Sequence, residues 1–187
     1  MDNKKLIENC VNILNENSAI VEGYSSLTYN QLNWRVSENK WSVGQCIDHL
    51  VTTNRLYLGI FERLAVDKYP DNVWMKINPF SKMLGKWLVK YTGNRVVKPL
   101  KSPGAFRPSS SNIEPEIINQ FGVLQVDLIQ SLKAIGKIDI NKKIIASPAN
   151  KWITYPLKDA IVIVTEHEVR HISQANGVRE SIPENID

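Results

Sequence analysis

The chain has 187 residues, of which 43% are hydrophobic and 22% are charged, with a formal net charge of +4. This length supports one well-buried core and is short for two, so we expect a single domain over residues 1–187. Two cysteines, Cys10 and Cys46, lie far apart and outside any C-x-x-C pattern, which argues against a disulfide scaffold or a zinc-cysteine knuckle. No signal-peptide pattern and no membrane-span-length apolar run occurs, so we expect a soluble, cytoplasmic protein without a membrane partner.

Helical signals dominate the first third of the chain. Residues 3–23 carry apolar side chains at helical intervals and stop at Gly23, which predicts a first helix. The segments 28–31 and 42–45 both fit a capping box, in which a hydroxyl and a glutamine satisfy free backbone N–H groups. The second box predicts a helix from Ser42 to about Val66.

The middle of the chain is basic. Residues 71–79 are predicted as a loop, 80–91 as a short helix, and 92–115 as a long irregular stretch rich in proline, glycine and serine. The span 72–113 contains no acidic residue and eight basic ones, so removing it from the net charge of +4 leaves −4 for the rest of the chain. These basic residues are Lys76, Lys82, Lys86, Lys90, Lys98, Lys101, Arg95 and Arg107.

Within the short helix, Lys82, Lys86 and Lys90 form a stripe at i, i+4 and i+8. We interpret this stripe as a solvated helix face, in preference to a membrane or nucleic-acid contact. The stretch 92–115, together with the basic helix, is our candidate for a pocket cover that attracts an acidic substrate.

Two prolines introduce the remaining long helices. Pro115 is placed in the first turn of a helix that ends near Gly136, and Pro156 in that of a helix that runs to Asn176 and is closed by Gly177. Residues 138–145 are rich in β-branched side chains and could form a short strand. We therefore predict an all-α fold: a four-helix bundle with a short extra helix and a long loop between helices two and three.

All three histidines of the chain fall in predicted helices. His167 and His171 are four residues apart and project from the same helix face, and His49 lies in the second long helix. Three neutral imidazoles resemble the catalytic zinc pattern that leaves a coordination position open, so we predict a divalent metal site. Imidazole suits zinc, nickel and iron alike, and an ion held by neutral ligands keeps its charge and favours anions such as thiolate or hydroxide.

Helical geometry selects two further candidates on the last helix. Gln174 projects within about 20° of His167, and Glu168 within about 60° of His171. We predict Gln174 as a residue that orients substrate or bound water, with helix-end hydrogen bonding as the alternative. Glu168 is the second candidate catalytic residue, because 167–171 also reads H-E-x-x-H, in which the glutamate is the general base of zinc peptidases.

Several segments together resemble one protein family. Residues 41–50, WSVGQCIDHL, are similar to the W-S-x-x-E-x-x-x-H-L opening of the DinB-like (DinB/YfiT) superfamily, and residues 167–174, HEVRHISQ, to its closing H-x-x-x-H-x-x-Q motif. Leu32-Asn33-Trp34-Arg35, Phe106-Arg107-Pro108 and Tyr155-Pro156-Leu157 also resemble that family. The resemblance spans nearly the whole chain, with one departure at Gln45, where glutamate is common in the family.

The resemblance implies a bundle of up-down-down-up order, a divalent metal held by His49, His167 and His171, and a homodimer. Family members include bacillithiol- and mycothiol-dependent transferases and isomerases, alongside proteins described only as metal-dependent hydrolases. We therefore expect a metal-dependent thiol transferase or hydrolase that acts on a small molecule, which could be a low-molecular-weight thiol. No nucleic-acid partner is expected.

Two alternatives remain open. The first is a bundle that binds a metal or a small molecule without turnover, in a sensor or stress-response role. The second is an H-E-x-x-H zinc peptidase, which is weakened because no further ligand follows at a peptidase spacing and no sheet is predicted to hold an extended peptide.

Overall fold

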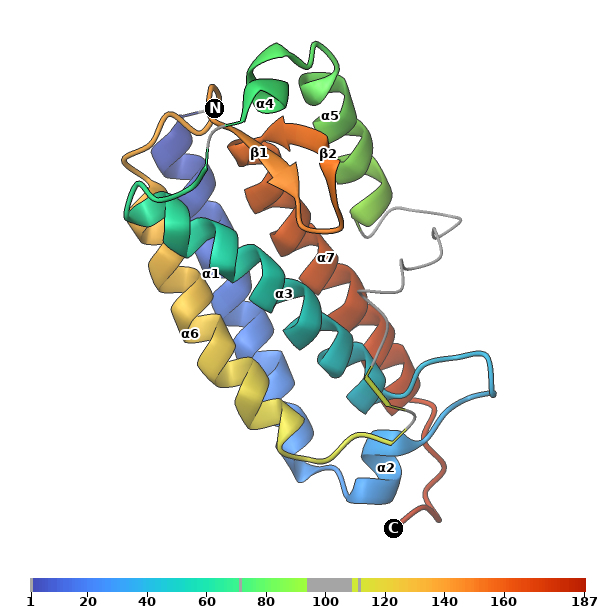
Figure 1. Cartoon of the computed structure of the whole chain (residues 1–187). Coiled ribbons are helices and arrows are strands. Elements are labelled where there is room, and N and C mark those ends of the chain that lie inside the picture. The colour runs from blue at the N-terminus through green and yellow to red at the C-terminus, as the bar shows by residue number, and fades with distance from the viewer. Residues whose placement is uncertain (1, 71, 94–108, 111) are drawn as a thin grey trace.

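Four long helices form a bundle in the computed structural model (Figure 1), which describes residues 2–70, 72–93, 109–110 and 112–187. They are α1 (Asn3–Glu22), α3 (Val43–Ala65), α6 (Ile117–Ile135) and α7 (Leu157–Arg179). The smaller elements are η1 (Gly23–Ser26), α2 (Tyr29–Asn33), α4 (Val73–Ile77), α5 (Ser81–Thr92), and the strands β1 (Ile144–Ser147) and β2 (Asn150–Pro156). The predicted all-α class is confirmed; the sheet that the described residues add to it is a two-stranded antiparallel hairpin.

The order of the long helices matches the order that the family resemblance implies. Helix α3 packs against α6 and α7, and α1 packs against the same two helices. In Figure 1, α1 and α7 run from the end that holds the N-terminus toward the opposite end, whereas α3 and α6 run the other way. The sequence of directions is therefore up-down-down-up. Among the described residues, no helix is long and apolar enough to cross a membrane.

Each long helix contributes side chains that are fully removed from solvent. Leu14, Leu50, Leu128 and Ile161 come from α1, α3, α6 and α7 in turn, and all are 0% exposed. Burying an aliphatic side chain of this size contributes about 1.5–3 kcal/mol, so this shared core is the main stabilising contact of the bundle.

Both predicted capping boxes are present. In the second box, the backbone N–H of Gln45 donates to Ser42 Oγ at 3.1 Å, and the backbone N–H of Ser42 donates to Gln45 Oε1 at 3.1 Å. The first box, at Thr28 and Gln31, has the same reciprocal bonds. The second box fixes the start of α3 two turns before His49.

Three predicted elements differ from the structure. The predicted loop at 71–79 contains helix α4, because the Asn72 side chain caps it by accepting from the backbone N–H of Met75 at 2.8 Å. The strand predicted at 138–145 begins only at Ile144, and its partner β2 was not predicted. Helix α7 passes through Gly177 and ends at Arg179, so this glycine does not stop it. Most of the predicted irregular stretch, residues 94–108 and 111, lies outside the described residues.

Gly85 is the point at which α5 comes closest to its neighbours. A Cβ atom at this position would overlap the carboxyl group of Asp159 on α7 and lie 3.0 Å from Cβ of Tyr155 on β2. Any larger side chain would therefore push α5 away from α7 and the hairpin.

Gly85→Ala is expected to lower the free energy of unfolding by about 1–3 kcal/mol, because it overpacks this contact. Gly59→Ala is the matched control, since Gly59 lies inside α3 with nothing within 4 Å of an added Cβ. This control should stabilise the protein by about 0.5–1 kcal/mol through helix propensity. Urea denaturation measures both; equal stabilisation by the two substitutions would contradict the close contact at Gly85.

Candidate metal centre

The three histidines meet between α3 and α7. His49 Nε2 lies 3.1 Å from His167 Nε2, and one ligand nitrogen from each of His49, His167 and His171 lies within 4.8 Å of the other two. Two nitrogens bound to one tetrahedral zinc ion at about 2.0–2.1 Å are themselves about 3.3 Å apart. The observed spacing therefore fits three donors around a shared ion, with small adjustments of side-chain torsions.

The helices account for this convergence. His167 and His171 are one turn apart on α7 and their ring centroids are 4.5 Å apart. The His49 ring lies 4.9 Å from that of His167 and 4.5 Å from that of His171. Among the described residues, these three form the group of histidine, cysteine and acidic side chains that could hold a metal ion.

The surroundings keep the two histidines of α7 neutral. Burial, together with charge repulsion from His49 and Arg170, lowers the pKa of His171 to about 3, against a side-chain hydrogen bond with Gln174 that raises it. Burial likewise lowers the pKa of His167 well below its ordinary value, assisted by His171, His49 and Arg170. Only a neutral imidazole can donate a lone pair to a metal, so the donor set suits a divalent cation at neutral pH.

Trp41 forms one wall of the cluster. Its ring stacks on His171, with centroids 5.6 Å apart and an interplanar angle of 25°, and lies 4.9 Å from the ring of His49. Sequence analysis did not single out Trp41 as a site residue. Its place directly before the Ser42 cap is the available signal, because the cap fixes where the chain enters α3 relative to His49.

The first two turns of α3 also hold the segment at 109–110. Asp48 Oδ2 accepts from the backbone N–H of Ser109 at 2.6 Å, and Asp48 Oδ1 accepts from Ser109 Oγ at 3.0 Å. The Gln45 amide donates to the carbonyl of Ser110 at 3.2 Å. A glutamate at position 45 would lack this N–H donor, which gives a local reason for the departure from the family pattern.

Glu168 points into the core of the bundle. It is 0% exposed, and its carboxylate accepts hydrogen bonds from the side-chain amides of Asn17 at 2.9 Å, Asn54 at 2.6 Å and Gln125 at 2.7 Å. Burial raises the pKa of Glu168 to about 7 against these three bonds, which lower it. These hydrogen bonds indicate a structural role for the Glu168 carboxylate. They do not support the predicted catalytic role, which stays a prediction.

Gln174 lies one turn beyond His171 and is half-buried. Its side chain interacts with His171 strongly enough to affect the pKa of that imidazole. The residue is therefore close to the cluster beside His171, whereas the helical angles had aligned it with His167, and its action on a substrate stays a prediction.

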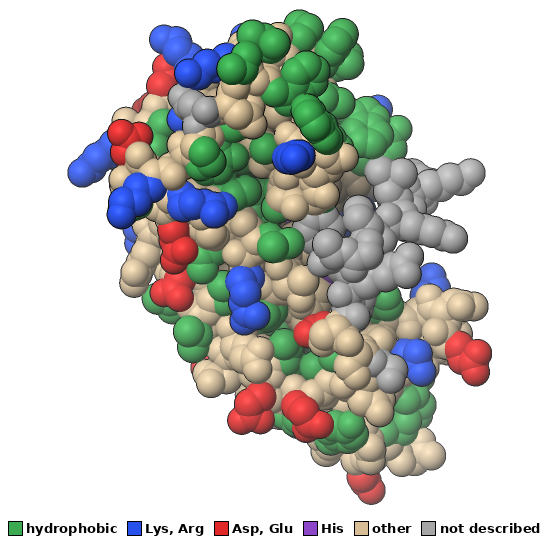
Figure 2. Space-filling view, in the orientation of Figure 1, with side chains coloured by type: hydrophobic (Ala, Val, Ile, Leu, Met, Phe, Trp, Pro, Cys, Tyr) green, Lys and Arg blue, Asp and Glu red, His purple; other side chains and the backbone are tan. Residues whose placement is uncertain are grey.

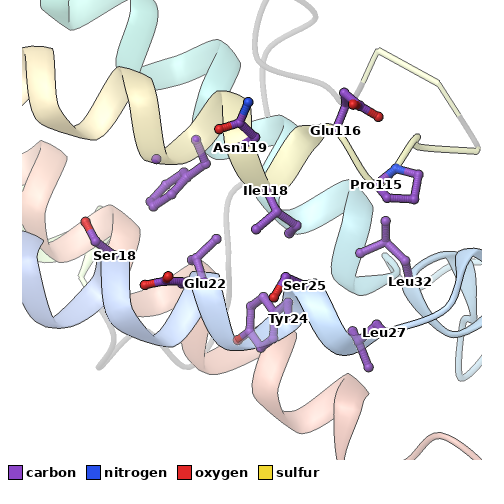
Figure 3. A pocket seen from close by; sticks show the side chains of 13 residues that line it. Ser18, Glu22, Tyr24, Ser25, Leu27, Leu32, Pro115, Glu116, Ile118 and Asn119 are labelled. Atoms are coloured by element: carbon purple, nitrogen blue, oxygen red, sulfur yellow. The ribbon is translucent and has the colours of Figure 1, made fainter.

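A cavity of about 450 Å³ lies elsewhere, between α1, η1 and the start of α6 (Figure 3). Glu22, Tyr24 and Ser25 face it from one side, and Glu116, Ile118 and Asn119 from the other. No histidine lines this cavity. The cavity is therefore separate from the candidate metal centre.

The bundle and its histidine cluster define the class of the protein: a four-helix bundle whose centre can host a metal ion. The family model described as the DinB superfamily matches residues 19–175, and the chain belongs to this superfamily. No curated protein and no solved structure shows a significant match to the chain.

Zn²⁺ or Ni²⁺ is expected to raise the melting temperature of chelator-treated protein, because an ion that binds the folded state alone stabilises it by about 2.7 kcal/mol at one hundred times its Kd. His171→Ala should abolish this shift, since it removes one of three ligands. Glu62→Ala, an exposed position on α3, should leave it unchanged. Differential scanning calorimetry with and without metal measures the effect, and an undiminished shift in His171→Ala would rule out the cluster as the binding site.

Glu168→Ala is expected to destabilise the protein by about 3 kcal/mol or more, because it removes the acceptor of the buried Asn17 and Asn54 amides and leaves the Gln125 amide with only the Leu14 carbonyl. Glu168→Gln should cost less and should retain the metal-dependent shift in melting temperature, since it preserves the shape and one acceptor. Chemical denaturation and calorimetry test both. An alanine variant as stable as the parent would refute the structural role.

Proposed function

We propose that this protein is a metal-dependent enzyme of the DinB superfamily that transfers or hydrolyses a group on a small molecule. The observation that carries the proposal is the convergence of the three imidazoles; among the described residues, no carboxylate belongs to this cluster. When bound there, a divalent ion would act as a Lewis acid that lowers the pKa of a thiol or water. Zinc, nickel and iron are all compatible with these ligands.

The residues around the cluster have separable roles in this proposal. His49, His167 and His171 hold the ion, and Trp41 restricts the rotation of two of these rings by packing against them. Gln174 orients a substrate group beside His171. Each role requires the α3 and α7 backbones to keep their relative register.

Electrostatics favours an anionic substrate. Arg170 is close enough to lower the pKa of both histidines of α7, and its guanidinium is held in place by donating to the carbonyl of Tyr91 at 3.2 Å. A cation beside an ion that keeps its full charge attracts thiolates and carboxylates. We therefore place thiol transfer ahead of hydrolysis of a neutral compound.

The two alternatives differ in their support. Zinc peptidase chemistry requires Glu168 to act beside the metal, whereas its carboxylate is fully buried and bonded to three amides. Non-catalytic metal binding would use the same histidine cluster. Only a measurement of turnover distinguishes it from a catalytic role.

Metal-loaded protein is expected to accelerate the loss of a low-molecular-weight thiol, such as bacillithiol or cysteine, in the presence of an electrophile such as monochlorobimane. His49→Ala should remove this activity, because it removes the ligand that α3 contributes. Glu62→Ala is the matched control on the same helix. Fluorescence of the thioether product measures the rate, and full turnover by a folded His49→Ala variant would reject thiol transfer at this centre.

A further inference from the structure

An exposed apolar surface with a lysine stripe lies on α4, α5 and β2. Six of its side chains are between 45% and 71% exposed: Val73, Ile77, Phe80, Met83, Trp87 and Trp152. Lys82, Lys86 and Lys90 are also exposed on α5. We call these nine residues the apolar-basic patch.

The patch is continuous across the three elements. The Trp74 indole N–H donates to the carbonyl of Trp152 at 2.8 Å, and their rings are 6.3 Å apart, which joins α4 to the hairpin. Helix α5 packs along β2. In Figure 2, hydrophobic side chains gather over the end of the molecule where Figure 1 places α4 and α5.

The buried face of α5 explains its packing without these residues. Ser81 and Gly85 are the buried positions of the helix, and Gly85 makes the close contact with Asp159 and Tyr155. Met83 and Trp87 lie on the other face with the lysines and contribute little to this contact. Large contiguous apolar surfaces of this kind commonly mark interaction sites in soluble proteins.

We propose that the apolar-basic patch docks on the surface of an anionic phospholipid bilayer. Aromatic side chains favour the headgroup level, aliphatic side chains favour the acyl-chain boundary, and lysines bind anionic headgroups while their stems lie along the apolar surface. No acidic residue occurs in 72–93, so nothing in this segment repels an anionic surface. The sequence led us to expect no membrane partner. The exposed apolar side chains of the patch are the reason for proposing one.

Charge argues against a second copy of the chain as the binding partner of the apolar-basic patch. A two-fold contact uses the same surface on both copies, so it would bring the stripe of Lys82, Lys86 and Lys90 near its own copy and cause repulsion. A nucleic acid would satisfy the lysines and could stack on Trp87 and Trp152. It would leave the most exposed aliphatic side chains, Val73 and Ile77, without an apolar partner.

Cosedimentation of the full chain with vesicles tests the proposal. Binding is expected for phosphatidylcholine vesicles that contain phosphatidylglycerol, should weaken as salt is added, and should be much weaker for phosphatidylcholine alone. The variant Lys82→Gln/Lys86→Gln/Lys90→Gln should bind about fivefold more weakly per lysine removed. Its control is Lys5→Gln/Lys40→Gln/Lys133→Gln, which removes the same charge from exposed positions outside the patch.

A second pair of variants tests the apolar component. Ile77→Ser/Phe80→Ser/Met83→Ser should weaken binding to the anionic vesicles by about tenfold or more. Val123→Ser/Val126→Ser removes similarly exposed apolar side chains from α6 and should bind as the parent does. Calorimetry confirms that every variant is folded, so that lost binding reports the surface.

Three outcomes would overturn the proposal. The first is no binding to anionic vesicles, or binding that both patch variants retain in full. The second is a dimer, detected by analytical ultracentrifugation, that dissociates in the apolar patch variant while vesicles are not bound. The third is binding of a single-stranded oligonucleotide that depends on the patch, without binding of vesicles.

Discussion

The structure depends on polar side chains that α7 carries into the centre of the bundle. Glu168 and His171 are buried on the face that packs against α1 and α3. A buried carboxylate or imidazole is tolerated only if it is hydrogen-bonded, neutral or bound to a metal. The two polar groups meet this requirement differently: Glu168 is bonded to amides, and the pKa of His171 is lowered so that the ring stays neutral.

The amide partners of Glu168 come from all three other long helices. Asn17 belongs to α1, Asn54 to α3 and Gln125 to α6, so one carboxylate bonds to each remaining wall of the bundle. Sliding any helix along its axis would break one of these bonds and leave a buried polar group unsatisfied. His167 directly precedes Glu168 on α7. The network therefore also fixes the position of His167 along the bundle axis relative to His49 on α3.

Local patterns in the sequence were enough to predict the parts of this arrangement that depend on one helix. The i, i+4 spacing placed His167 and His171 together, and the Ser42 box placed the start of α3. The contacts of Glu168 could not be predicted, because Asn17, Asn54 and Gln125 lie far from it in sequence and carry no motif. The H-E-x-x-H spacing suggested a reactive carboxylate, whereas the opposite helices decide what a glutamate at this position contacts. Gly177 failed as a helix stop for a similar reason, since packing of α7 outweighs a modest propensity cost.

Parallel order of α3 and α6 explains why the chain has a segment outside the bundle. A short loop can join only antiparallel neighbours, and the chain must return along a helix of about 30 Å before α6 can begin. Helices α4 and α5 lie in this return connection and rest on the hairpin and α7. Helix α5 packs on α7 and the hairpin through its buried face, where Gly85 makes the closest contact. The outer face of α4 and α5 is therefore free to carry apolar and basic side chains whose exposure the requirements of the core do not explain.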